Sequence, residues 1–298
     1  MHINDMSNIN IKDLPQSETL STPLPHREGQ GESLLVIKVG GAVVEDERQL
    51  AQLLNDFRDI EGRKILVHGG GRRATAVAAQ LGIETKMIDG RRITDAPMLD
   101  VVTMVYGGLV NKTLVARLQA LGIDAIGLTG ADANVIKSHR RPPISLPTGE
   151  GQGGALDYGF VGDVDAVAGS KIAHFIEAGI TPVMAPLTHD GQGQMLNTNA
   201  DTIASEVAKA MAAEGYDVTL VYCFEKPGVL RQADDDSSVI PVITADSFRE
   251  LTADGTISGG MLPKLQNAFA AIRAGVSQVI ITHATDLSGE KGTKIINN

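Results

Sequence analysis

The sequence predicts an α/β fold, a three-layer αβα sandwich with a mostly parallel central sheet. Three observations carry this prediction. Short apolar segments alternate with amphipathic ones from residue 34 onward, several apolar segments have no polar face, and glycine clusters follow two of them. Strands without a polar face are typical of parallel sheets, because helices cover both of their faces.

The composition fits this class and excludes others. The chain has 298 residues, 43% of them hydrophobic, which is enough for a sizeable core and excludes a disordered protein. Its net charge of −10 disfavours nucleic acids and anionic membranes as partners, because like charges repel. Cys223 is the one cysteine of the sequence, so neither a disulfide framework nor a thiolate metal cluster is expected. We find no targeting or membrane segment and expect a cytoplasmic protein.

The N-terminal residues 1–33 differ from the rest of the chain. They have no sustained apolar period and are interrupted by prolines and glycines: Pro15, Pro23, Pro25, Gly29 and Gly31. Such a segment buries too little surface to offset its ordering entropy, so we predict a flexible tail.

The elements of the sandwich begin with a strand over residues 34–39, an apolar run broken by Lys38. A helix follows, because apolar residues recur at the spacing of one helix face: Leu50, Leu53, Leu54 and Phe57. By the same patterns, further strands are predicted over 65–68, 125–128, 181–185, 218–222 and 278–282. Further helices are predicted over 74–81, 99–121, 165–178, 199–213, 245–253 and 261–274. The Gly- and Pro-rich stretch 140–162 is expected to form hairpins or loops.

Glycine clusters close the first two predicted strands, at Gly40-Gly41 and Gly69-Gly70-Gly71. Ligands of open α/β sheets bind beyond the carboxyl ends of the strands, where glycine lets backbone N–H groups approach an anion. We therefore expect the two clusters to form one anion cradle. Each cluster alone is also explained by a tight turn. Neither is a G-x-G-x-x-G or a G-x-x-x-x-G-K-[ST] fingerprint.

Two lysines stand where a bound anion would compensate them. Lys38 loses solvation near the end of an apolar strand, although a side chain that reaches the solvent at the sheet rim would also explain it. Lys264 falls in the first turn of the last predicted helix, where the helix dipole is already positive. A bound phosphate would compensate the buried charge of Lys38 and offset the repulsion between Lys264 and the helix dipole.

Polar residues elsewhere are candidates for substrate binding. Arg92 follows a glycine-led turn, and its planar guanidinium suits a carboxylate, unless it is an ordinary solvated charge. Asn197 lies at a strand end, where it could grip a carboxylate as well. Asn199 as an N-cap with Asp201 in the first turn is a sufficient structural explanation of these two residues.

Six segments occur in the order seen in the amino acid kinase family: Val36 to Gly41, Val67 to Gly71, Gly90 to Thr94, Val110 to Lys112, Leu196 to Asp201 and Gly259 to Lys264. From residue 34 to the C-terminus the chain resembles this family, and within it the branch that phosphorylates the side-chain carboxylate of an N-acylated glutamate in arginine biosynthesis. The resemblance implies the amino acid kinase fold, ATP as co-substrate with Mg²⁺ on the nucleotide, and a homodimer. It also implies an acylglutamate-binding lobe with the dimer interface over residues 34–212 and a nucleotide-binding lobe over residues 213–298.

The resemblance also implies roles for single residues. Lys38 and Lys264 resemble the lysines that stabilise the transferring phosphoryl group, and Asp201 resembles the carboxylate that orients both. Gly41 and Gly70 resemble glycines whose N–H groups face the phosphates and the nucleophile. The implied substrate-binding residues are Gly70, Gly71, Arg92 and Asn197. The implied nucleotide-binding residues are Glu225, Lys226, Pro227, Gly228, Val229, Leu230, Thr256, Ile257 and Ser258, and no protein metal ligand is implied.

The chain departs from the family pattern at three points. The segment from Tyr222 to Pro227 is atypical, because the family usually has an aspartate near Glu225. Arg72 follows the triple glycine where many relatives have proline. Residues 1–33 do not resemble the N-terminal helix of arginine-inhibited relatives.

The expected reaction needs no general base, because a glutamate side chain is already ionised at neutral pH. Repulsion between two anions is the obstacle, and cations, N–H groups and Mg²⁺ overcome it. We therefore favour a structural role for His68. The alternatives are a family member acting on carbamate, aspartate, glutamate or UMP, a nicotinamide oxidoreductase, and a ligand-sensing protein on the same fold. The acyl group is also open: N-succinylglutamate instead of N-acetylglutamate would demand a further cation in the site.

Overall fold

The computed structural model describes residues 31–88, 90–145, 155–259 and 261–297. The chain divides into two units, residues 1–30 and residues 31–298, and the fold given below is that of the second. The predicted flexible tail lies outside the described residues, except for its last three positions. The middle of the predicted loop region 140–162 lies outside them too.

The centre of the fold is an eight-stranded sheet with the strand order β14-β16-β15-β13-β1-β2-β10-β5. Its pairs are parallel apart from β15 and β16, which are antiparallel. The bounds are β1 Ser33–Val39, β2 Arg63–His68, β5 Ala125–Leu128, β10 Thr181–Met184, β13 Asp217–Phe224, β14 Val242–Ile243, β15 Gln278–His283 and β16 Thr293–Ile295. The predicted strands are confirmed, with small shifts at their ends, whereas β14 and β16 were not predicted.

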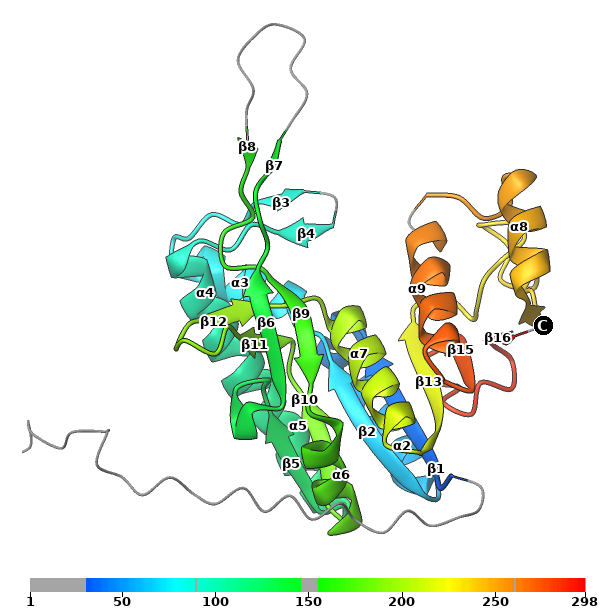
Figure 1. The fold of residues 1–298 in the computed structure, drawn as a ribbon, viewed down its shortest axis with the longest axis horizontal. Helices are drawn as coiled ribbons and strands as arrows, with labels where there is room; N and C mark the ends of the chain where they lie inside the picture. Colours follow the sequence, from blue (N-terminus) through cyan, green and yellow to red (C-terminus); the bar gives the residue numbers. More distant parts are fainter. Residues whose placement is uncertain (1–30, 89, 146–154, 260, 298) are drawn as a thin grey trace, which may run out of the picture. The chain divides into compact units, whose positions relative to one another are not determined.

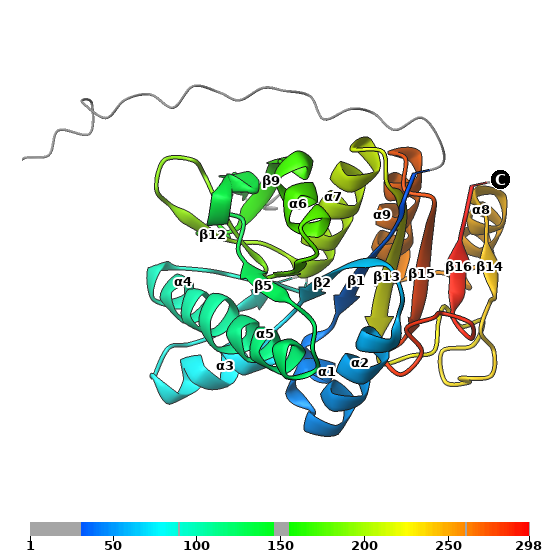
Figure 2. The same cartoon turned by 90° about the horizontal axis from the view of Figure 1, so that it is seen from below.

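Helices cover both faces of this sheet, as the two ribbon views show (Figures 1 and 2). One face carries α1 (Gly41–Glu45), α2 (Glu47–Asp59) and α3 (Gly71–Gln80), and the other carries α6 (Gly169–Glu177), α7 (Ala200–Ala213) and α9 (Met261–Arg273), with α8 (Ala245–Ala253) beside α9. Each face has its own apolar core, and β1 contributes to both: Val36 packs with α7 and α9, and Ile37 packs with α2. The predicted three-layer sandwich is confirmed.

A long helical run covers the face of the sheet that α2 and α3 share. It consists of α4 (Ala96–Val102), a π-helical segment (Thr103–Val110) and α5 (Asn111–Ala120). It begins three residues before the predicted helix, because the Asp95 side chain caps it by accepting a hydrogen bond from the Met98 N–H. By length and composition this run could cross a membrane, but half of its most apolar window is buried in the fold. Packing against the sheet accounts for its apolar character.

A second, four-stranded sheet has the order β12-β11-β6-β9, with β6 Ile136–Arg140, β9 Gly162–Val167, β11 Leu187–His189 and β12 Met195–Asn197. The predicted helix over 165–178 is wrong at its start, because residues 165–167 belong to β9. Residues 163–166 alternate polar and apolar side chains, β9 pairs with β6, and the helix begins at Gly169. Two hairpins, β3–β4 (Met87–Ile88 and Arg91–Arg92) and β7–β8 (Ile144–Ser145 and Ala155–Leu156), complete this end of the molecule.

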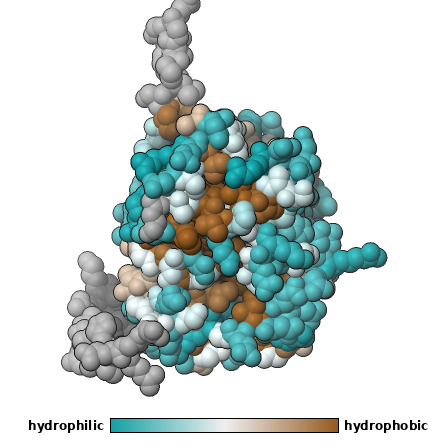
Figure 3. All heavy atoms as spheres, turned by 90° about the vertical axis from the view of Figure 1, so that its right-hand side faces the viewer, coloured by the Kyte–Doolittle hydropathy of each residue, from teal (hydrophilic) through white to brown (hydrophobic). Residues whose placement is uncertain are grey.

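The side of the molecule with α8 and β14 is shown in Figure 3, where apolar residues gather in the middle of a mostly hydrophilic face. Val242 on β14 is among the exposed apolar residues. Since β14 is the edge strand of the large sheet, its backbone lies open on one side.

Candidate active site

The two glycine clusters lie together at the carboxyl ends of β1 and β2. These strands are parallel neighbours, so both end at the same edge of the sheet. A Cβ atom on Gly41 would lie 3.3 Å from the backbone nitrogen of Gly70 and 3.4 Å from that of Gly71. Gly41 and Gly71 begin helices, so their N–H groups have no acceptor inside those helices. The clusters are adjacent as expected, and their binding of an anion stays a prediction.

Lys38 and Asp201 form an ion pair beside this cradle. Lys38 Nζ lies 2.7 Å from Asp201 Oδ1, with the lysine side chain 10% exposed and the aspartate side chain 26% exposed. Lys38 therefore does not reach the solvent at the sheet rim, the alternative that the sequence allowed. The Asn199 side chain caps α7 by accepting from the N–H groups of Asp201 and Thr202. Among the described residues no donor is aligned for a hydrogen bond with Asp201 Oδ1, so this carboxylate can accept another donor.

Lys264 approaches the same space from the first turns of α9. Burial lowers the pKa of Lys264, the charge of Asp201 raises it, and the charge of Lys38 lowers it. Its Nζ lies 3.8 Å from the centroid of the Phe224 ring, and Lys38 Nζ lies 5.3 Å from the same centroid. The fold thus brings the two predicted lysines and the predicted aspartate together.

A cavity of about 440 Å³ opens beside the lysines. Its walls include Gly41, Phe224 and Lys264, and three residues of the predicted nucleotide segment: Glu225, Lys226 and Gly228. The other residues of the predicted nucleotide segment do not line this cavity. The side chains of Val229 and Ile257 pack in the apolar core, because both are branched aliphatic residues behind the loop. Among the described residues, the cavity walls do not include the other predicted positions: Pro227, Leu230, Thr256 and Ser258.

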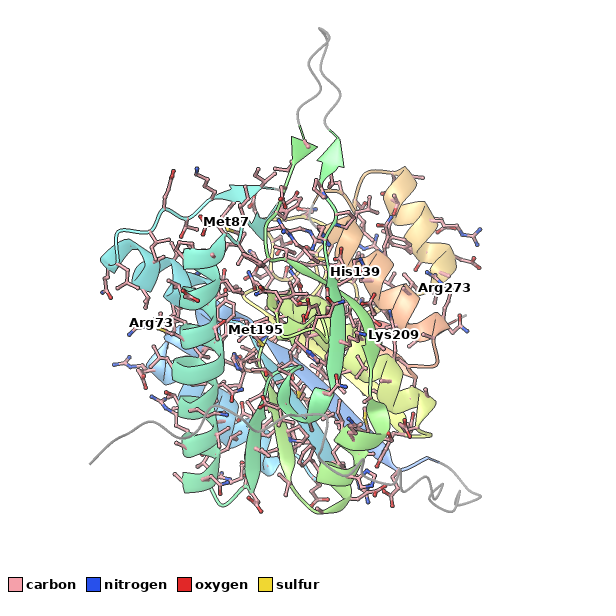
Figure 4. All side chains as sticks on the ribbon, turned by 60° about the vertical axis from the view of Figure 1, so that its left-hand side comes forward. Arg73, Met87, His139, Met195, Lys209 and Arg273 are labelled. Atoms are coloured by element: carbon pink, nitrogen blue, oxygen red, sulfur yellow. The ribbon has the colours of Figure 1, made fainter. Side chains whose placement is uncertain are left out.

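A smaller cavity of about 200 Å³ meets the first one at Gly71, which lines both. All four predicted substrate-binding residues line it: Gly70, Gly71, Arg92 and Asn197. Asn197 donates one amide hydrogen bond to Thr94 Oγ1 at 2.9 Å. Met87 on β3, labelled in Figure 4, also lines this cavity.

The Arg92 guanidinium is held by the protein itself. Nη2 donates to the Gly71 carbonyl at 2.8 Å and to Thr75 Oγ1 at 2.9 Å. Nη1 donates to Thr85 Oγ1 at 3.2 Å and lies 3.8 Å from the Met98 sulfur. The expected free bidentate fork is therefore already engaged, and a carboxylate would have to displace the weaker of these contacts. Arg92 also fixes the glycine segment through the Gly71 carbonyl.

Arg91 is the second cation of the smaller cavity. Within the described ranges its side chain forms neither a hydrogen bond nor an ion pair. Burial lowers its pKa and the nearby Arg141 lowers it further, whereas Asp163 raises it. Asp163 is itself bound by Arg141. The charge of Arg91 is therefore poorly compensated, and an anion in the cavity would compensate it.

His68 lies under the glycine cluster in a buried hydrogen-bond network. Its Nδ1 lies 2.8 Å from the Gly69 carbonyl, and its Nε2 lies 3.1 Å from Asn111 Nδ2, which also donates to the Val183 carbonyl. A neutral ring with the proton on Nδ1 satisfies both contacts. Burial lowers the pKa of His68 to about 4, and this keeps the ring neutral. These contacts agree with the structural role that the sequence favoured.

The described residues contain no group of three or more His, Cys, Asp or Glu side chains that could hold a metal ion. The groups around the larger cavity are mainly cations, backbone N–H groups and apolar side chains. Such a set suits phosphate oxygens and not a resident divalent ion.

Two aromatic residues of the site were not foreseen. Tyr106 closes the smaller cavity, and its ring lies 3.0 Å from where a Cβ on Gly70 would stand. Phe224 lies beneath both lysines. The sequence could have indicated Phe224 through its i, i+2 spacing from Tyr222 on β13. This spacing directs both rings to the face of the sheet that carries Lys38.

Comparisons with known proteins bear on the family and the fold of the chain. A family model described as "Amino acid kinase family" matches residues 33–283. The chain is 62% identical to a protein named acetylglutamate kinase from Bacteroides thetaiotaomicron, over 89% of this chain and 98% of that protein. A protein of the same name from Cytophaga hutchinsonii is 52% identical over 90% of this chain and all of that protein. Among solved structures, carbamate kinase from Giardia lamblia shares the fold with a TM-score of 0.57 at 15% identity, covering 90% of this chain and 99% of that one.

Proposed function

Since the chain belongs to the amino acid kinase family, we propose that it transfers the γ-phosphoryl group of ATP to the side-chain carboxylate of N-acetyl-L-glutamate, the acetylglutamate kinase reaction of arginine biosynthesis. The relatives at 52–62% identity carry that name over nearly their whole length. One observation carries the proposal best: Lys38, Lys264 and Asp201 converge beside the glycine cradle where a larger and a smaller cavity meet. A nicotinamide oxidoreductase is excluded by the family.

The proposed reaction is an in-line displacement at phosphorus. A carboxylate oxygen of the substrate forms a bond to the γ-phosphorus, while the bond from that phosphorus to the bridging oxygen of ADP breaks. ATP occupies the larger cavity and the acylglutamate the smaller one, so the attacking and leaving groups face each other across Gly71. No proton has to be removed from the attacking carboxylate.

The site residues act on negative charge. Lys38 and Lys264 neutralise the oxygens of the transferring group, and Asp201 keeps the lysines oriented. The N–H groups of Gly41, Gly70 and Gly71 supply further donors. Mg²⁺ bound to the nucleotide adds charge neutralisation at the phosphates.

Assembly and location complete the proposal. Residues 34–212 form the acylglutamate lobe and residues 213–298 the nucleotide lobe, in a cytoplasmic homodimer. The helical run 96–120 is the proposed dimer contact, because its π-helical segment exposes two large apolar side chains, Met104 at 54% and Leu109 at 45%.

N-succinylglutamate is a second candidate substrate, and Arg91 is the observation that favours it. A succinyl group carries a carboxylate that an acetyl group lacks. Arg91 offers a poorly compensated cation in the cavity assigned to the acylglutamate.

A coupled assay of ADP release separates these functions. Purified protein receives Mg·ATP with N-acetylglutamate, N-succinylglutamate, free glutamate, carbamate or no acceptor. The proposal expects turnover with an N-acylglutamate and none with glutamate or carbamate. Turnover that is independent of the acyl group would overturn it. Arg91→Leu should weaken kcat/KM for N-succinylglutamate but not for N-acetylglutamate if the second candidate is right.

A further inference from the structure

The ammonium groups of the two phosphoryl-stabilising lysines share one aromatic ring. Phe224 ends β13, and its ring centroid lies 3.8 Å from Lys264 Nζ and 5.3 Å from Lys38 Nζ. Cations within about 6 Å of a ring centroid are attracted by the negative face of the ring. Both lysines are therefore in range of the same ring.

The protein charges at this point do not balance. Two ammonium groups face one carboxylate, that of Asp201, which lies 2.7 Å from Lys38. The charge of Lys38 disfavours the charged form of Lys264, and so does burial. Before a nucleotide arrives, an apolar neighbour at this position would leave Lys264 poorly stabilised. An aromatic face suits this position because it is apolar and attracts cations.

The same strand also contacts the backbone of Asp201. Side chains alternate along β13, so Tyr222 and Phe224 point to one face of the sheet, and Tyr222 pairs with Lys38 in the strand register. The Tyr222 hydroxyl donates to the backbone carbonyl of Asp201 at 3.2 Å. The two rings stack with their centroids 6.1 Å apart. One aromatic pair thus contacts Lys38, Lys264 and Asp201.

We propose that Phe224 is a positioning residue for phosphoryl transfer, whose ring seats the ammonium groups of Lys264 and Lys38 at the end of the larger cavity. This inference rests on the proposed function. The ring touches the lysines and acts through them. It raises the share of enzyme in which Lys264 is charged and both ammonium groups are aimed at the incoming phosphate.

The test compares Phe224→Leu, which keeps an apolar side chain without a ring, with Phe224→Tyr, which keeps the ring. In the acylglutamate-dependent assay, Phe224→Leu should lower kcat about 2- to 30-fold, the range of cation–π contacts. The alkaline limb of its kcat–pH profile should move to lower pH, because the charged form of Lys264 loses the stabilisation that the ring provides. Phe224→Tyr should restore both. Phe248→Leu is the matched control, since Phe248 is another half-buried ring that packs on Phe269 away from the lysines.

A double-mutant cycle decides whether the ring acts through Lys264. With Lys264→Ala already present, Phe224→Leu should cause a smaller loss of kcat than it does in the wild-type background, because only Lys38 still contacts the ring. Equal losses in both backgrounds would overturn the inference, and so would an unchanged pH profile in Phe224→Leu. A raised KM for ATP with unchanged kcat would overturn it too, because it would make the ring a nucleotide contact. Absence of acylglutamate-dependent turnover in the wild-type enzyme would be a failure of the proposed function itself. A circular dichroism melt of each variant confirms folding, and Phe224→Met replaces Phe224→Leu if the latter does not fold.

Discussion

Acid should destabilise the protein through protonation of His68. The ring is fully buried, and burial lowers its pKa to about 4 from an ordinary value of 6.5. Between these two values the unfolded chain binds a proton at this position and the folded protein does not. The stability contributed by the neutral ring is therefore complete above pH 6.5 and is lost as the pH falls toward 4.

The size of this effect follows from the two pKa values. Their difference of about 2.5 corresponds to about 3 kcal/mol at 1.36 kcal/mol for each pH unit. Of this, about 2 to 3 kcal/mol should be lost between pH 7.5 and pH 4.5. That is a large part of the free energy of unfolding of an ordinary domain.

His68→Gln is the perturbation that tests this reasoning. A glutamine amide can still face the Gly69 carbonyl and the Asn111 amide, but it does not titrate. Urea unfolding followed by circular dichroism, at a fixed protein concentration and at several pH values, gives the free energy of unfolding of both proteins. The variant should be less stable than the wild type at pH 7.5, and the gap should shrink by about 2 to 3 kcal/mol at pH 4.5. Parallel curves for the two proteins would refute the reasoning.

Four further predictions concern the proposed site and assembly. Lys38→Ala or Lys264→Ala should each lower kcat by roughly 10²–10³, and wild-type kcat in a folded variant would contradict their roles. Arg92→Lys should raise KM for the acylglutamate more than KM for ATP in steady-state kinetics, whereas equal effects would point to a misplaced site. Asp201→Asn should lower kcat with little change in Tm; an active but unstable variant would make Asp201 a helix N-terminal residue only. Deletion of residues 1–30 should leave a homodimer in light scattering, with unchanged turnover and no inhibition by millimolar arginine. A hexamer that becomes a dimer on this deletion would contradict that expectation.

The sequence was informative where a residue conflicts with its own local structure. Lys38 lies in an apolar strand and Lys264 at a helix start, and both positions predicted a bound anion. The fold brings the two ammonium groups to the same aromatic ring, that of Phe224. The strands were found because continuous apolar runs are typical of a parallel sheet. Helix starts followed from caps such as Asn199.

Other features depend on contacts that no local pattern reports. Arg91 and Arg92 are adjacent, and the sequence alone did not tell which has free donors; tertiary contacts with Thr75, Thr85 and Gly71 engage Arg92. Strand β9 was missed because its pairing partner, β6, is more than twenty residues away in the chain. The side chain of Val229 packs in the core although its neighbours line a cavity, and a family motif does not distinguish these two environments.

The central claim is that this chain forms an acyl phosphate on an N-acylglutamate, with Lys38 and Lys264 stabilising the transfer. Trapping that product with hydroxylamine tests the claim most directly, because an acyl phosphate reacts to a hydroxamate that can be identified by mass. With Mg·ATP and the N-acylglutamate that supports ADP release, the wild-type enzyme should form hydroxamate and ADP in equal amounts. The Lys38→Ala and Lys264→Ala variants should form both products at rates roughly 10²–10³ lower. ADP release without hydroxamate, or undiminished hydroxamate formation in either variant, would contradict the account.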